Sequence, residues 1–126
     1  MSKEGESLSN YLKKILERAP GIQAAAITDR DGALVVKADD LSEEDIGSHF
    51  ASTFAVATDQ AGKLKMGKAL SVISFYDNRV IYHLSHSPLI LSFIGTADAN
   101  VGVLVSFSED IKRALDPLRD ALQEKE

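Results

Sequence analysis

The sequence predicts an α+β fold in which a five-stranded antiparallel sheet is sandwiched between helices. Apolar residues recur at helical spacing near both ends of the chain and in its middle, and short apolar runs bounded by turn residues lie between these segments. With 126 residues, of which 44% are apolar and 26% charged, the chain has the size and composition of one globular domain. We therefore expect a single domain over residues 1–126, with a flexible stretch at residues 1–6.

The first predicted helix leads into a β-hairpin. The apolar stripe of this helix consists of Leu8, Tyr11, Leu12, Ile15, Leu16 and Ala19. Its opposite face carries Lys13, Lys14, Glu17 and Arg18. Pro20 and Gly21 then stop the helix. Two short apolar runs, at residues 22–28 and 33–38, flank a turn that contains aspartate and glycine, which is typical of two paired strands.

A second helix is predicted over about residues 43–63, preceded by an acidic cluster at residues 39–45. This cluster is either a solvated helix start or a docking patch for a basic partner. The apolar stripe of the helix consists of Ile46, Phe50, Phe54, Ala57, Ala61 and Leu64. Beside the stripe lies a row of small residues, Ala51, Ala55, Thr58 and Gly62, which allows another backbone to approach closely.

Three strands are predicted next, at residues 70–76, 79–85 and 89–94. The last run is apolar at nearly every position, as expected of a strand that is buried on both faces in the middle of a sheet. Residues 101–107 fit either a strand, because of their β-branched content, or the buried first turns of a terminal helix. That helix continues through Ile111, Ala114, Leu115, Leu118 and Leu122, and we expect it to kink or restart at Pro117.

Composition and charge exclude several classes of function. A net charge of −5 argues against general affinity for nucleic acid or for an anionic membrane. The lack of cysteine excludes disulfides, thiol catalysis and cysteine-based zinc sites. No run approaches the ~18 apolar residues of a membrane span, and the first residues do not resemble a signal peptide.

One segment, GKLKMGKA at residues 62–69, nearly matches the phosphate-binding pattern GxxxxGK[ST]. Ala69 replaces the hydroxyl residue that would bind magnesium, and the segment is predicted to follow a helix and open a strand, the reverse of a P-loop. A nucleotide-binding enzyme is therefore a disfavoured alternative. His83 and His86 are three apart on a predicted strand, so they point to opposite faces and chelate a metal poorly. We expect no catalytic residue, no metal and no cofactor.

The strand predicted at residues 70–76 contains no charged residue. Soluble proteins normally protect an exposed sheet edge with lysine, proline or a bulge. Either this strand is internal to the sheet, or another chain covers it. The pattern of residues alone does not decide between these alternatives.

Several segments resemble one family. STFAVATDQAGKL at residues 52–64, ITDRDG at residues 27–32 and SPLILSFIG at residues 87–95 are similar to the MAP-kinase scaffold subunits of the Ragulator (late endosomal/lysosomal adaptor and MAPK and mTOR activator) complex, which belong to the roadblock family. The similarity extends from about residue 8 to residue 122.

The resemblance implies a roadblock/longin-like fold with strand order 2-1-5-4-3, which places residues 70–76 at the sheet edge. In this family the edge strand pairs with the same strand of a second roadblock subunit, and the second helices pack together. The implied partner interface consists of Ala51, Phe54, Ala55, Thr58, Gly62, Leu70, Val72, Ile73, Ser74, Phe75 and Tyr76.

The resemblance also implies a function. It implies a non-catalytic scaffold that heterodimerises with a paralogous roadblock subunit and joins the other Ragulator subunits. The complex would lie peripherally on the cytosolic face of late endosomes and lysosomes, held there only by a lipidated partner, with some of the subunit in the cytoplasm. There it would support signalling by Rag GTPases and mTOR and would gather MAP-kinase pathway kinases. The alternative is a roadblock homodimer that regulates a small GTPase.

Overall fold

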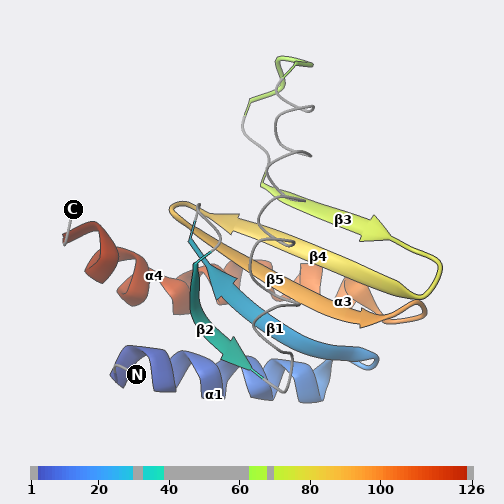
Figure 1. Cartoon of the computed structure of the whole chain (residues 1–126), viewed down its shortest axis with the longest axis horizontal. Helices are drawn as coiled ribbons and strands as arrows, with labels where there is room; N and C mark the ends of the chain where they lie inside the picture. The colour runs from blue at the N-terminus through green and yellow to red at the C-terminus, as the bar shows by residue number, and fades with distance from the viewer. Residues whose placement is uncertain (1–2, 30–32, 39–62, 68–69, 125–126) are drawn as a thin grey trace.

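The computed structural model describes residues 3–29, 33–38, 63–67 and 70–124 (Figure 1). The elements are α1 (Lys3–Arg18), β1 (Ile22–Thr28), β2 (Leu34–Ala38), β3 (Ser71–Phe75), β4 (Arg79–His86), β5 (Leu89–Thr96), α3 (Val101–Ser106) and α4 (Ser108–Glu124). The predicted α+β class and the hairpin at the start of the chain are confirmed. The acidic cluster and almost all of the second predicted helix, residues 39–62, lie outside the described residues.

The five strands form one antiparallel sheet in the order β2-β1-β5-β4-β3, as expected. β5 lies at its centre and is buried at every position except the last. The prediction of a central strand at residues 89–94 is therefore confirmed. Because β5 is flanked by β1 and β4 and covered on both faces, its residues are shielded from water on every side. At this centre Phe93 lies between Ala25 of β1 and Tyr82 of β4.

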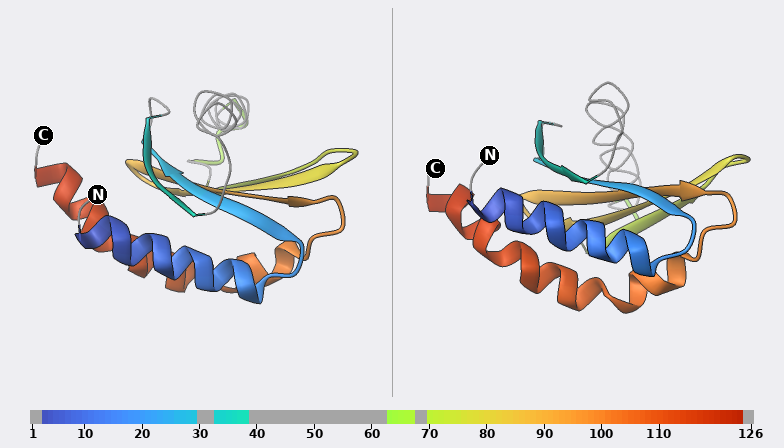
Figure 2. Two further views of the ribbon diagram at one scale, coloured as in Figure 1. Left: turned by 60° about the horizontal axis from the view of Figure 1, so that its bottom comes forward. Right: turned by 90° about the horizontal axis from the view of Figure 1, so that it is seen from below.

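The main core lies between one face of the sheet and the helices α1 and α4, which run side by side beneath it (Figure 2). Alternate residues of each strand point to this face, whereas the helices present residues three and four apart. The largest buried members of this core include Leu12, Ile27, Leu84, Leu91, Phe93, Leu104, Ile111 and Leu115. Burying one such side chain contributes roughly 1.5–3 kcal/mol, so this layer dominates the stability of the fold.

The opposite face of the sheet carries a second, smaller buried cluster. Its apolar members are Ala24, Ala26 and Ile94, with Leu34 and Ile81 packed against them. The polar residues Thr28, His83 and Ser92 are also buried on this face. The sheet thus buries residues on both faces, and short side chains from β1 dominate the second face.

The ends of the helices agree only in part with the sequence pattern. α1 begins at Lys3, so residues 3–6, which were expected to be flexible, are helical. It ends before Gly21, whose φ of +88° is accessible to glycine at low cost. α4 contains Pro117 and neither ends nor restarts there. None of the described helices is long and apolar enough to cross a membrane.

In the ambiguous segment at residues 101–107, Val101–Ser106 form the helix α3. Val101 and Leu104, one helical turn apart, are both buried, whereas alternate residues would be buried in a strand. This spacing, rather than the β-branched content, decides the structure of the segment.

Candidate partner interface

β3 is the edge strand of the sheet, which decides the question that the sequence leaves open. Its five residues, SVISF, include no charge and no proline. The side chain of Phe75 is 72% exposed and that of Ile73 is 40% exposed, and both lie on the same face as α1 and α4. β3 therefore combines an edge position with large apolar side chains in water and lacks the usual protection against pairing.

The direction of the backbone groups of β3 follows from its pairing with β4. The Ser85 amide donates to the Leu70 carbonyl at 3.0 Å, and the Tyr76 amide donates to the Arg79 carbonyl at 2.8 Å. In an antiparallel pair the hydrogen-bonded positions alternate. Residues 70, 72, 74 and 76 thus bond to β4, while the amides and carbonyls of residues 71, 73 and 75 point away from it. The outer row is a ready template for another strand.

The turn before β3 also exposes large apolar side chains. Leu64 and Met66 are 65% and 74% exposed, and Leu70 is exposed as well. Leu64 was predicted to lie on the apolar stripe of the second helix, and this was wrong: residues 63–65 form a turn. In the sequence, the alternation of Leu64 and Met66 with lysines just before an uncharged strand indicates that these apolar side chains are exposed.

The predicted interface residues fall into two groups. Leu70, Val72, Ile73, Ser74, Phe75 and Tyr76 come together along the β3 edge. Ile73 and Phe75 face one side of the sheet, and the half-buried Val72 and Ser74 face the other. The other five predicted residues, Ala51, Phe54, Ala55, Thr58 and Gly62, lie outside the described residues.

The segment that resembled a P-loop leads into β3. Residues 63–65 form a turn, residues 66–67 belong to no helix or strand, and β3 begins at Ser71. A P-loop instead opens a helix, whose N-terminus holds the phosphate. The described part of this segment therefore has the context of a connector to the edge strand.

The two strand histidines point to opposite faces, as predicted. His83 is fully buried, and its Nδ1 lies 2.8 Å from the Ser92 hydroxyl on the adjacent strand. The His86 Nε2 lies 2.6 Å from an Asp116 oxygen of α4 and 3.2 Å from Arg119. The hydrogen bond with His86 holds the pKa of Asp116 below its usual value.

The burial of His83 makes the free energy of unfolding of the chain depend on pH. Burial lowers the pKa of His83 from 6.5 to about 4, because the charged imidazolium loses its hydration. The folded state therefore keeps His83 neutral, while the unfolded chain takes up a proton below its pKa of 6.5. This contribution to stability is present at pH 7 and is lost as pH falls from about 6.5 towards 4.

We expect the free energy of unfolding to fall by about 2 kcal/mol between pH 7 and pH 5 because of His83 alone. A His83→Gln variant keeps a group that can hydrogen bond to Ser92 but has no proton to gain. Urea unfolding at the two pH values measures both proteins. Other groups contribute equally to each, so an identical pH dependence in the two proteins would contradict the assignment.

Known proteins of similar sequence place the chain in a family. A family model described as "Mitogen-activated protein kinase kinase 1 interacting" matches residues 6–122. The chain belongs to this family. Among curated members of similar sequence, the Ragulator complex protein LAMTOR3 of Danio rerio is 37% identical over 120 residues, which cover 94% of this chain and 97% of that protein. The human protein of the same name is 34% identical over the same shares of the two chains.

Solved structures identify the fold of this member of the MAP kinase kinase 1 interacting family. A Roadblock/LC7 domain from Streptomyces avermitilis superposes with a TM-score of 0.72 at 15% identity, covering 84% of this chain and 92% of that one. The gliding protein mglB from Thermus thermophilus gives a TM-score of 0.80 at 13% identity, covering 96% and 94%. The chain therefore has the roadblock fold, as its sequence implied.

Proposed function

We propose that the chain is a non-catalytic scaffold subunit that forms a heterodimer with a second roadblock subunit across the β3 edge. The observation that carries this proposal is an uncharged edge strand with Phe75 and Ile73 exposed and a row of backbone groups directed away from the sheet. A strand of the partner continues the sheet by forming main-chain hydrogen bonds, and apolar side chains bury one another on either side. A stable pair of this kind buries about 1,600 Å² or more in total.

The relatives support the proposal of a larger assembly. Proteins of similar sequence along nearly their whole length carry the name of the Ragulator complex. We infer that this chain joins the corresponding complex on the cytosolic face of late endosomes and lysosomes, attached through a lipidated partner. Its further partners there are Rag GTPases, acting in mTOR signalling, and MAP-kinase pathway kinases.

The proposed scaffold acts by raising the local concentration of the proteins that it binds. Two proteins held on one scaffold meet at an effective concentration that can reach the millimolar range, without any new contact between them. Such a role requires durable pairing and accessible outer surfaces rather than a reactive group. The β3 edge supplies the pairing surface and leaves the outer surface of α1 and α4 accessible.

Affinity purification of the chain from its native cells, followed by identification of the bound proteins and native mass measurement, tests this proposal. We expect a second roadblock subunit in a one-to-one ratio, together with further Ragulator subunits. Purification of the chain as a stable dimer of two identical copies, with no second roadblock subunit, would favour the homodimeric alternative. Saturable, magnesium-dependent ATP binding would favour the enzyme alternative.

A further inference from the structure

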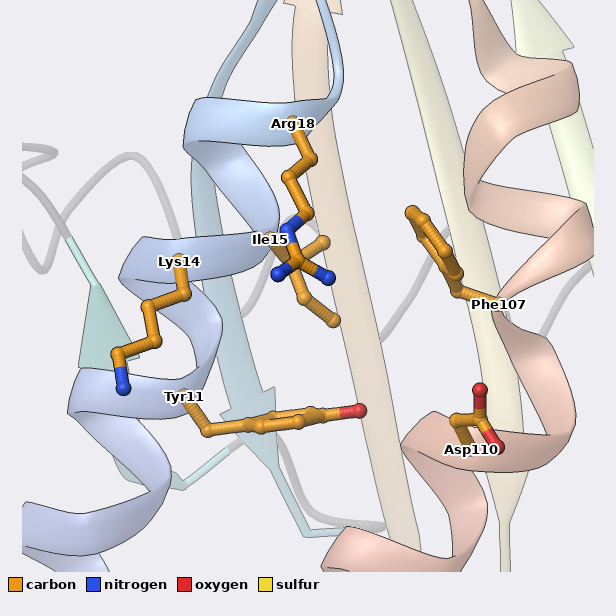
Figure 3. Close-up of a pocket in the computed structure, with 6 residues that line it drawn as sticks. All are labelled: Tyr11, Lys14, Ile15, Arg18, Phe107 and Asp110. Carbon is orange, nitrogen blue, oxygen red and sulfur yellow. The ribbon is translucent and has the colours of Figure 1, made fainter.

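A pocket of about 350 Å³ lies between α1 and the start of α4, on the helical side of the molecule (Figure 3). Tyr11, Lys14, Ile15 and Arg18 line it from α1, and Phe107 and Asp110 line it from the other side. The ring of Tyr11 extends across one end towards Asp110, and the Arg18 side chain reaches into the space between Ile15 and Phe107. We call this feature the α1–α4 pocket.

The inner wall of the α1–α4 pocket is apolar and firmly held. Ile15 belongs to the main core, and Tyr11 and Phe107 pack against that core while remaining partly exposed. Aromatic side chains fixed in this way provide a large contact area at a small entropic cost. The wall therefore suits one large apolar side chain of a ligand.

The rim of the pocket carries positive charge that the described residues do not neutralise. Asp110 pairs with Arg113 at 3.5 Å. In contrast, Lys14 and Arg18 form no ion pair with any residue of the described part of the chain. Burial, followed by the charge of Asp110, raises the pKa of Tyr11, whereas Arg113 and Arg18 lower it, so these charges act directly on the pocket. Lys14 and Arg18 therefore place positive charge beside the apolar wall of the pocket.

We propose that the α1–α4 pocket binds an acidic peptide segment of a partner protein. One large apolar side chain of the segment packs against Tyr11 and Phe107, beside the Arg18 side chain. Carboxylates that flank this side chain face Lys14 and Arg18. The complementary charge selects an acidic ligand, and the apolar wall requires the central side chain, so both features are needed for binding.

This surface is separate from the β3 edge. α1 packs against β1 and β2, which lie at the opposite end of the strand order from β3. The pocket lies between α1 and the start of α4, whereas β3 forms the edge of the sheet opposite β2 (Figure 1). One subunit can therefore hold a paired subunit and an acidic segment at once, and each site can be tested without the other.

The test measures the binding of a fluorescein-labelled peptide, Glu-Asp-Phe-Asp-Glu, to the full chain in its purified complex by fluorescence anisotropy. We expect saturable binding, with an affinity about tenfold lower in an Arg18→Glu variant. Lys13→Glu is the matched control, since it makes the same charge change on the same helix outside the pocket. A peptide with glycine in place of phenylalanine is expected to bind about tenfold more weakly than the first.

Three outcomes would overturn the proposal. The first is the absence of saturable binding up to about 1 mM peptide, which corresponds to a free energy of only about −4 kcal/mol. The second is an equal loss of affinity in Lys13→Glu and Arg18→Glu, because the effect would then be general charge. The third is binding to vesicles that contain phosphatidylserine but not to the peptide, which would assign the cations to a membrane surface. Unfolding in urea confirms that each variant is folded, and both changes are on exposed side chains.

Discussion

An Ile73→Pro variant will lose its pairing with the partner subunit, with an affinity reduced about 100-fold or more, and will still fold. The amide of residue 73 points away from β4, so proline removes no hydrogen bond within the chain. It does remove a donor from the row that a partner strand needs, and its ring blocks close approach of that strand. Co-purification with the partner, together with urea unfolding of the isolated chain, measures both effects.

Ser74→Pro is the matched control, one residue further along the same strand. The amide of residue 74 points towards β4, so proline there breaks the β3–β4 ladder itself. We expect this variant to be less stable than Ile73→Pro. Normal pairing by Ile73→Pro would show that the partner does not add a strand at β3.

A Phe93→Ala variant will lose about 3–5 kcal/mol of stability, which is a large part of the 5–15 kcal/mol typical of a domain. Phe93 is fully buried in the central strand, and its ring stacks on Tyr82 with a centroid distance of 6.2 Å. Truncation removes this contact and leaves a cavity between the sheet and the helices. Urea unfolding at pH 7 measures the loss.

Phe75→Ala provides the comparison, because it deletes the same side chain from the exposed edge. With a side chain that is 72% exposed, it should change the stability of the isolated chain by no more than about 0.5 kcal/mol. The same change is expected to weaken pairing with the partner. Equal loss of stability in the two variants would mean that Phe75 is part of the core of the isolated subunit.

Much of the fold was predictable because its signals are local or nearly so. The apolar run at residues 89–94 predicted a central strand, since burial on both faces imposes a composition that no edge strand shares. The hairpin and the terminal helices follow equally from turn residues and helical spacing. The Val101–Ser106 helix was not decided because β-branched content is a weak local preference, and packing of Val101 and Leu104 into the core overrides it.

The surfaces were less predictable, because they depend on where distant segments meet. An uncharged strand at residues 70–76 is compatible with the centre of a sheet, and only the strand order makes it an edge. Leu64 fitted the spacing of a helix whose end the sequence does not mark. The α1–α4 pocket joins Tyr11 to Phe107, which are far apart in the chain, and it exists only because α1 and α4 lie against the same face of the sheet.

The open β3 edge has a consequence for the dosage of the subunit. A surplus molecule without the proposed partner presents an open strand to other molecules, and such an edge is a template for incorrect pairing. Binding of the partner to the folded state also raises the apparent stability of the subunit through mass action. Under the proposed heterodimer, we therefore expect balanced synthesis of the two subunits to limit incorrect pairing, and the abundance of one subunit to affect the lifetime of the other.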